Sequence, residues 1–149
     1  MKAGALILAA FAMAALGAAA ADAKFGTSEE AKAMLKKVEG ELKLDKATTM
    51  QKMKNGDEGF KDRDLYPFCI GPDGKTTAHA MKERIGEKAT DLKDKNGKAF
   101  AKEMVDTAKE GKVSEVSYYF PRPGEKDAVQ KVSYVTKIGD QVCGVGYYK

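Results

Sequence analysis

The sequence VSYYFPRPGEKDAVQKVSY, residues 116–134, decides the fold around it because it has the pattern of two strands joined by a turn. Both arms are rich in the β-branched and aromatic residues that favour strands. The segment between the arms contains Pro121, Pro123 and Gly124. Proline fixes its own φ and lacks an amide donor, so this segment ends one strand before the next begins. The pattern predicts a β-hairpin with Tyr118 and Lys131 on its two arms, close enough to contact one small anion.

Three further strands are predicted on the two sides of this hairpin. Residues 65–70 and 75–80 are strand-like, and the turn sequence Gly-Pro-Asp-Gly at 71–74 separates them. Gly-Asp at 139–140 leads into a last strand over residues 141–148. Strands joined by such short turns predict an antiparallel sheet.

One long helix is predicted before the sheet, over residues 27–55. Thr27 and Glu30 have the spacing of a capping box, and Asn55-Gly56 is a good left-handed C-cap. The apolar residues between these caps recur at helical spacing and include two methionines, which we interpret as core. They are Ala31, Met34, Leu35, Val38, Leu42, Met50 and Met53.

A charged, irregular connection over residues 81–98 leads to a second, shorter helix over residues 99–109. The element order therefore predicts an α+β domain with a PAS-like topology. In this fold the long N-terminal helix packs on a five-stranded antiparallel sheet that has a helical crossover.

Residues 1–23 have the pattern of a secretory signal peptide. Lys2 precedes a long apolar run, and the small-residue pattern at 21–23 fits a cleavage site before Lys24. A retained membrane anchor is the alternative, but the run is rich in alanine and weakly hydrophobic for a membrane span. We therefore expect a periplasmic protein with one domain, residues 24–149, and no membrane span after cleavage.

Composition argues against several classes of function. The 149-residue chain carries 26 Lys and Arg against 22 Asp and Glu, and charges of both signs are interspersed along it. A nucleic-acid binder would gather its basic residues on one face, so we expect no nucleic-acid partner. Two cysteines and one histidine, without CxxC or HxxxH spacing, are too few for a metal site. We expect neither a metal nor a cofactor.

The two cysteines, Cys69 and Cys143, fall in two different predicted strands. In an oxidising compartment such a pair forms a disulfide if the two strands are adjacent. Otherwise the two thiols pack as small buried apolar groups. The sequence leaves both interpretations open.

Short motifs along the chain, in their order, resemble the single Cache domain, the extracytoplasmic sensor module of many bacterial chemoreceptors and kinases. The resemblance covers residues 27–149. It implies a small-molecule pocket between a PAS-like sheet and the crossover connection, and ligands that are typically small organic acids. The motifs are Asp64-Leu65-Tyr66-Pro67-Phe68, Pro72-Asp73-Gly74, Ala78-His79, Ile85-Gly86, Asp94-x-x-Gly97-Lys98, Tyr118-x-Phe120-x-x-Pro123-Gly124, Lys131-Val132-Ser133-Tyr134-Val135 and Gly144-x-Gly146-Tyr147-Tyr148.

The resemblance implies three polar ligand-binding residues. Lys131 would form a charge-assisted bond to a carboxylate, although a lysine on the solvent face of a strand is the alternative. His79, which matches the family's histidine, would donate one bond as a neutral ring, or add charge as an imidazolium and make binding pH-sensitive between about pH 5 and 8. Tyr118 would donate from its phenol while its ring forms a wall of the pocket. For both His79 and Tyr118 a purely structural role is the alternative.

Three aromatic residues, Tyr66, Phe68 and Phe120, are expected to line the same space. Strand alternation places Lys131 and Tyr134 on opposite faces, so Tyr134 is expected to point away from the ligand.

Catalysis has little support in the sequence. We find no Ser-His-Asp order with a nucleophile elbow, no paired carboxylates in a convincing context and no phosphate-binding glycine loop. The acidic spacing of residues 94–98 is incomplete for a calcium loop, and we interpret the segment as a turn and helix start. We do not expect an enzyme.

The chain departs from the family in two ways. Ala80 follows the histidine where relatives often have proline, and the chain stops at Lys149 where receptors continue into a transmembrane helix and a signalling domain. The leading hypothesis is a soluble periplasmic binding or sensor module for a small organic acid, acting in chemotaxis or other signal transduction. The alternative is a Cache-fold protein that has no ligand of its own and docks on a membrane receptor, a kinase or an exported enzyme.

Overall fold

The five strands form one antiparallel sheet in the order β2-β1-β5-β4-β3. The computed structural model describes residues 23–149, so the predicted signal peptide, up to residue 22, lies outside the described residues. The predicted α+β fold is confirmed. Its elements are α1 (Ser28–Leu44), α2 (Lys46–Asn55), β1 (Pro67–Ile70), β2 (Thr76–Ala78), the 3-10 turns η1 (Lys82–Arg84) and η2 (Ala89–Asp91), α3 (Phe100–Thr107), β3 (Ser114–Pro121), β4 (Ala128–Ile138) and β5 (Gln141–Tyr148).

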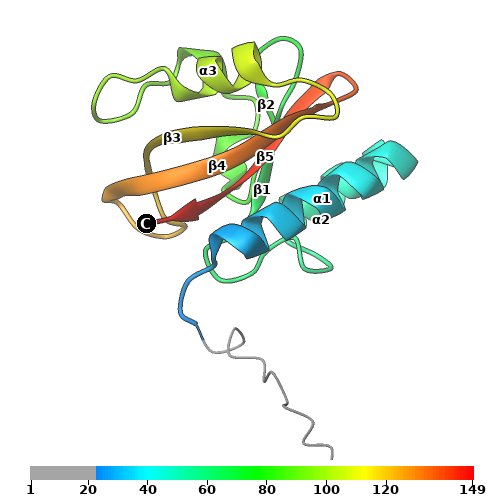
Figure 1. Ribbon diagram of the computed structural model, residues 1–149, viewed down its shortest axis with the longest axis horizontal. Helices are drawn as coiled ribbons and strands as arrows, with labels where there is room; N and C mark the ends of the chain where they lie inside the picture. Colours follow the sequence, from blue (N-terminus) through cyan, green and yellow to red (C-terminus); the bar gives the residue numbers. More distant parts are fainter. Residues whose placement is uncertain (1–22) are drawn as a thin grey trace, which may run out of the picture.

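The two faces of the sheet are covered by different helices. Helix α1 runs along one face, and α3 lies over the other (Figure 1). Apolar side chains of α1, such as Val38 and Leu35, are buried against the first face. Phe100 and Met104 of α3 belong to the core cluster on the second face. Within residues 23–149, no helix combines the length and the apolar character needed to cross a bilayer.

The hairpin of β3 and β4 has the predicted pairing. Tyr118 lies directly opposite Lys131, and Lys131 in turn lies opposite Tyr148 of β5. Because directly opposed residues project from the same face of a sheet, these three side chains share one face, the face that α3 covers. Tyr134 lies on the other face, where its hydroxyl contacts Ser28 of α1 at 2.6 Å.

The long N-terminal helix begins as predicted but is interrupted. The capping box is present: Thr27 accepts the amide of Glu30, and Glu30 accepts the amide of Thr27. The prediction of one helix through residue 55 was wrong, because α1 ends at Leu44 and the next residue, Asp45, adopts an extended conformation. The Asp45 carboxylate accepts the amide of Thr48 at 3.1 Å and so caps a second helix. Aspartate is a preferred N-cap residue, so Asp45 was a helix-start signal that the apolar stripe obscured.

The Asp94 loop ties the connection between β2 and α3 to the outer edge of the sheet. The Asp94 carboxylate accepts the amides of Asn96, Lys98 and Tyr119, and the Lys98 amine donates to the carbonyl of Ser117. Edge strands expose unpaired backbone groups that favour aggregation, and this loop satisfies two of them on β3. The segment is therefore a turn, and within residues 23–149 no group of three or more His, Cys, Asp or Glu could hold a metal ion.

A disulfide joins Cys69 of β1 to Cys143 of β5. The two residues are direct partners in the sheet, with their Cα atoms 4.1 Å apart, and both are fully buried. The adjacency of the two strands, which the sequence left open, is thus settled by the strand order.

Candidate functional site

A small cavity of about 40 Å³ lies between the sheet and the connection that runs from β2 into α3. One water needs roughly 10–15 Å³, so this cavity has room for a few waters or for a ligand of a few heavy atoms. One part of its wall is polar and the rest is apolar. The lining residues are Phe68, Ile70, Thr76, His79, Arg84, Glu87, Ala89, Leu92, Phe100, Ala101, Met104, Tyr118, Phe120 and Lys131.

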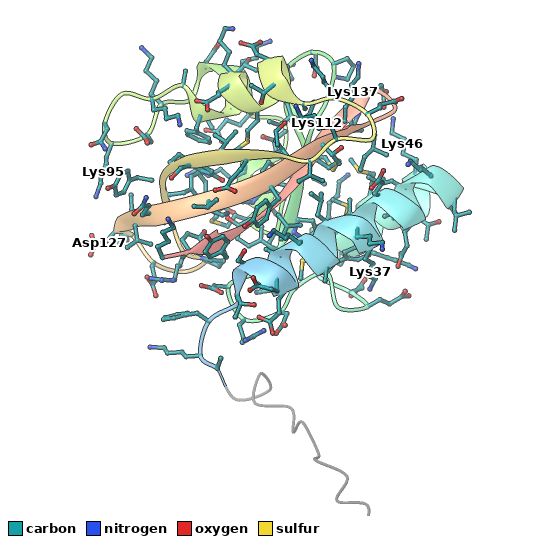
Figure 2. The ribbon with its side chains drawn as sticks, viewed as in Figure 1. Lys37, Lys46, Lys95, Lys112, Asp127 and Lys137 are labelled. Carbon is teal, nitrogen blue, oxygen red and sulfur yellow. A yellow bond between two sulfur atoms is a disulfide. The ribbon has the colours of Figure 1, made fainter. Side chains whose placement is uncertain are left out.

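The amine of Lys131 is almost completely enclosed, with 1% of the residue exposed. Other lysines behave differently: Lys46, Lys95 and Lys112 point outward from the fold (Figure 2). The space for the Lys131 side chain comes from β5, because a Cβ atom at Gly146 would lie 2.5 Å from Lys131 Cε. Aromatic rings surround the amine nitrogen, with centroids between 4.2 and 5.9 Å away. They are the rings of Tyr66, Phe68, Phe120 and Tyr148.

The hydrogen bond of the Lys131 amine goes to a neutral group. The amine donates to the Tyr66 hydroxyl at 2.9 Å, and among residues 23–149 no carboxylate lies within ion-pair distance of it. Burial lowers the pKa of Lys131 to about 7, and the more distant charge of Asp64 offsets only part of this effect. Asp64 itself is held by the Arg122 guanidinium at 3.2 Å and the Gly26 amide at 2.8 Å.

His79 lies after β2 and is buried, with 7% of the residue exposed. Its Nδ1 accepts the amide of Met81 at 3.0 Å, so the neutral ring carries its proton on Nε2. Burial, followed by the charges of Lys131 and Arg84, lowers the pKa of His79 to about 3. The expected titration of this histidine between pH 5 and 8 is therefore wrong. His79 lines the cavity as a neutral donor throughout that range.

Tyr118 lines the cavity, and its hydroxyl already has a protein partner. That hydroxyl lies 2.9 Å from Ser133 Oγ, and the ring stacks on Phe100 of α3 with centroids 4.4 Å apart. Burial raises the pKa of Tyr118 well above its ordinary value. The residue thus forms a wall that links β3 to α3, and a bond from its phenol to a ligand stays a prediction.

The predicted aromatic residues fall into two groups. Phe68 and Phe120 line the cavity, whereas Tyr66 lies behind Lys131 and holds its amine. The Tyr66 hydroxyl also contacts that of Tyr148 at 3.2 Å, and Tyr148 donates to the carbonyl of Pro121. Since each phenol has one proton, Tyr66 donates to Tyr148 and accepts from Lys131.

Sequence reasoning missed the charged pair that the connection contributes. Arg84 of η1 lines the cavity, pairs with Glu87 at 3.1 Å and lies over the ring of Phe120. The charged composition of residues 81–98 indicated a solvated connection, and no periodicity showed which of its side chains turn inward. For this side of the cavity the available sequence signal was the apolar pattern of the following helix, whose Phe100 and Met104 also line the cavity.

Comparison with known proteins identified related domains. The sequence model of the family described as Single Cache domain 2 matches residues 18–148. A methyl-accepting chemotaxis protein from Vibrio parahaemolyticus RIMD 2210633 has a similar crystal structure, with 24% identity and a TM-score of 0.67 over 80% of this chain and 86% of that chain. The periplasmic sensor domain of a chemotaxis protein is 20% identical, with a TM-score of 0.62 over 80% and 88% of the two chains.

A third solved structure describes carboxylic acid recognition by a Cache chemosensory domain. It is 22% identical, with a TM-score of 0.62 over 80% of this chain and 86% of that chain. At these identities the three structures establish a shared fold. The search of curated proteins found no match.

Proposed function

The chain belongs to the single Cache domain family, and from that premise we propose that it is a periplasmic sensor module that binds a small organic acid. The family consists of extracytoplasmic sensor domains. One solved neighbour is a Cache domain whose structure concerns carboxylic acid recognition, which supports this class of ligand. The cavity under α3 is the proposed site, with Lys131 as the group that binds the carboxylate.

The observation that carries this proposal is the buried amine of Lys131, which has no acidic partner at ion-pair distance within residues 23–149. A buried charge is ordinarily paired, because its removal from water is costly. A carboxylate in the cavity would supply that missing partner and form a charge-assisted hydrogen bond to the amine. The Nε2 proton of His79 is available as a second donor on the cavity wall.

The size of the cavity suits a ligand of a few heavy atoms. Apolar side chains, such as those of Ile70, Ala101 and Met104, form the rest of the wall and suit a short alkyl tail. A ligand of about six heavy atoms binds with at most roughly −9 kcal/mol, so we expect micromolar affinity. Acetate, propionate, pyruvate and lactate fit these constraints.

The test is a thermal-shift screen of the purified protein against acetate, propionate, pyruvate, lactate and amino acids. A ligand at 100 times its Kd should stabilise the protein by about 2.7 kcal/mol, which raises Tm by several degrees. Lys131→Met should abolish this shift, because it keeps an unbranched apolar stem and removes the amine. The matched control is Lys137→Met, which removes an exposed amine from the same strand and should leave the shift unchanged.

Absence of any shift across this panel would contradict the proposed function. Stable copurification of a partner protein in that case would favour the docking alternative.

The periplasmic location rests on residues 1–23, which we propose to be a cleaved signal peptide. Sequencing of the mature N-terminus from a periplasmic extract should find Lys24 as the first residue. Recovery of the intact chain in the membrane fraction would instead indicate a retained anchor.

A further inference from the structure

The groups that face Lys131 from each neighbouring element compensate its charge only in part. The chain before β1 contributes Asp64 and Tyr66, and Asp64 is already paired with Arg122. The turns after β2 contribute His79, Arg84 and Glu87, of which the last two pair with each other. β3 and β5 contribute the phenols of Tyr118 and Tyr148, and α3 contributes apolar residues.

The phenol chain behind Lys131 is directional. Tyr148 donates to the carbonyl of Pro121, so Tyr66 donates to Tyr148 and can only accept from Lys131. The amine therefore donates one N–H hydrogen bond to Tyr66 whether it is charged or neutral. When the amine is neutral, no group of residues 23–149 donates a hydrogen bond to its lone pair, which can take a proton from solvent.

We infer that the site takes up a carboxylate and a proton together, so that Lys131 becomes charged as the anion binds. This inference rests on the proposed function and adds a second bound species to it. The proton comes from solvent and forms an N–H bond at Lys131 Nζ, and the carboxylate stays ionised and pairs with the new ammonium. No other bond forms or breaks. The site gains no net charge, which suits an enclosed, largely aromatic wall.

The protonation equilibria of the other groups favour Lys131 as the acceptor. In the empty site its pKa is lowered to about 7, so the amine is mostly neutral at pH 8 and mostly charged at pH 6. The pKa of His79 is lowered to about 3, and its Nδ1 already accepts the Met81 amide. Carboxyl groups ionise near pH 4, so the ligand stays an anion over this range. Binding should therefore weaken about tenfold for each pH unit above 7.

The test is calorimetric titration of the purified protein at pH 6 and pH 8, each in phosphate and in Tris buffer. The probe is whichever of acetate, propionate, pyruvate and lactate gives the largest thermal shift. The dependence of the binding heat on the ionisation heat of the buffer counts the protons taken up. From a pKa of about 7 we expect about 0.9 proton for each ligand at pH 8 and about 0.1 at pH 6.

His79→Gln separates the two titratable candidates. The glutamine can still accept the Met81 amide, so the local backbone should be kept. Binding should weaken because the Nε2 donor of His79 is lost, while uptake of about 0.9 proton at pH 8 is retained. Loss of the uptake in this variant would assign the proton to His79 and overturn the inference. Binding with less than about 0.2 proton at pH 8 in the unmutated protein would also overturn it, while leaving the proposed function intact. Binding by no member of the panel would overturn both.

The amine can also be titrated without a ligand. NMR of the Lys131 side-chain signals in the empty protein should give a midpoint near pH 7. A midpoint above about pH 9 would overturn the inference.

Discussion

Lys131 is the residue on which the chemistry of the site depends, because its burial changes both binding and stability. Four aromatic rings surround its amine, and the one hydrogen bond it makes within residues 23–149 goes to the Tyr66 hydroxyl. The unfolded chain exposes this amine to water, where it ionises near pH 10.4. The folded protein therefore binds fewer protons than the unfolded chain between about pH 7 and pH 10.

This difference predicts that stability rises with pH in the absence of ligand. Below pH 7 the amine is charged in both states, and the burial of its charge lowers the free energy of unfolding. Between pH 7 and pH 9 the folded state sheds the proton that the unfolded state keeps, which adds about 2 kcal/mol to that free energy. Urea unfolding at the two pH values should show this rise in the unmutated protein and a nearly flat profile in Lys131→Met. Equal rises in the two proteins would contradict the assigned pKa.

At the same scale, the sequence indicated which residues would lie together but not how they would be protonated or hydrogen-bonded. Lys131, His79, Tyr118, Phe68 and Phe120 all line one cavity. Motif order placed them there, because a shared fold fixes which positions face the pocket. Their protonation and hydrogen bonding depend on burial and on neighbours from other elements. For that reason, no pattern in the sequence could show that His79 is held neutral.

At the scale of elements, β5 makes room for the site. Its two interior glycines face Phe68 and Lys131, and a Cβ atom at either would collide with a neighbour. A Cβ at Gly144 would meet Phe68 at 2.6 Å, and one at Gly146 would meet Ser133 Oγ at 2.3 Å. The glycine spacing on this strand therefore determines where the lysine stem lies.

Gly146→Ala should weaken ligand binding by displacing Lys131, with a loss of stability of about 1–3 kcal/mol from overpacking. The matched control is Gly40→Ala in α1, where nothing lies within 4 Å of the added atom. That substitution should raise stability by about 0.5–1 kcal/mol, since alanine favours helices. Calorimetric titration and urea unfolding of both variants check these expectations. Undiminished binding by Gly146→Ala would contradict the proposed position of the amine.

The elements themselves were predictable to different degrees. Strands β3, β4 and β5 follow from alternation and turn residues, which are local signals. The break at Asp45 and the inward turn of Arg84 do not, because a capping aspartate competes with a continuing apolar stripe and an irregular connection has no period. The sequence therefore predicted the sheet face of the site better than the connection that covers it.

At the scale of the whole molecule, the disulfide holds the centre of the sheet. Cys69 and Cys143 join β1 to β5, and the cavity lies on the same sheet. The bridge links residues 74 positions apart, so it restricts the unfolded chain over much of the domain. Helices cover both faces of this sheet (Figure 1).

Removal of the bridge should lower the free energy of unfolding by about 4 kcal/mol, because the loop that it closes is long. Guanidinium unfolding of the unmutated protein with and without reductant measures this difference. The Cys69→Ala/Cys143→Ala double variant should have the same free energy of unfolding with and without reductant. A reduced protein as stable as the oxidised one would show that the bridge contributes little.

The binding of a small carboxylate by Lys131 is the central claim, and a crystal structure of the protein with the strongest ligand of the panel tests it most directly. The account predicts the carboxylate inside the cavity beneath α3, with one oxygen at hydrogen-bond distance, about 2.7–2.9 Å, from Lys131 Nζ. A ligand bound elsewhere on the protein, with the cavity unchanged, would contradict it.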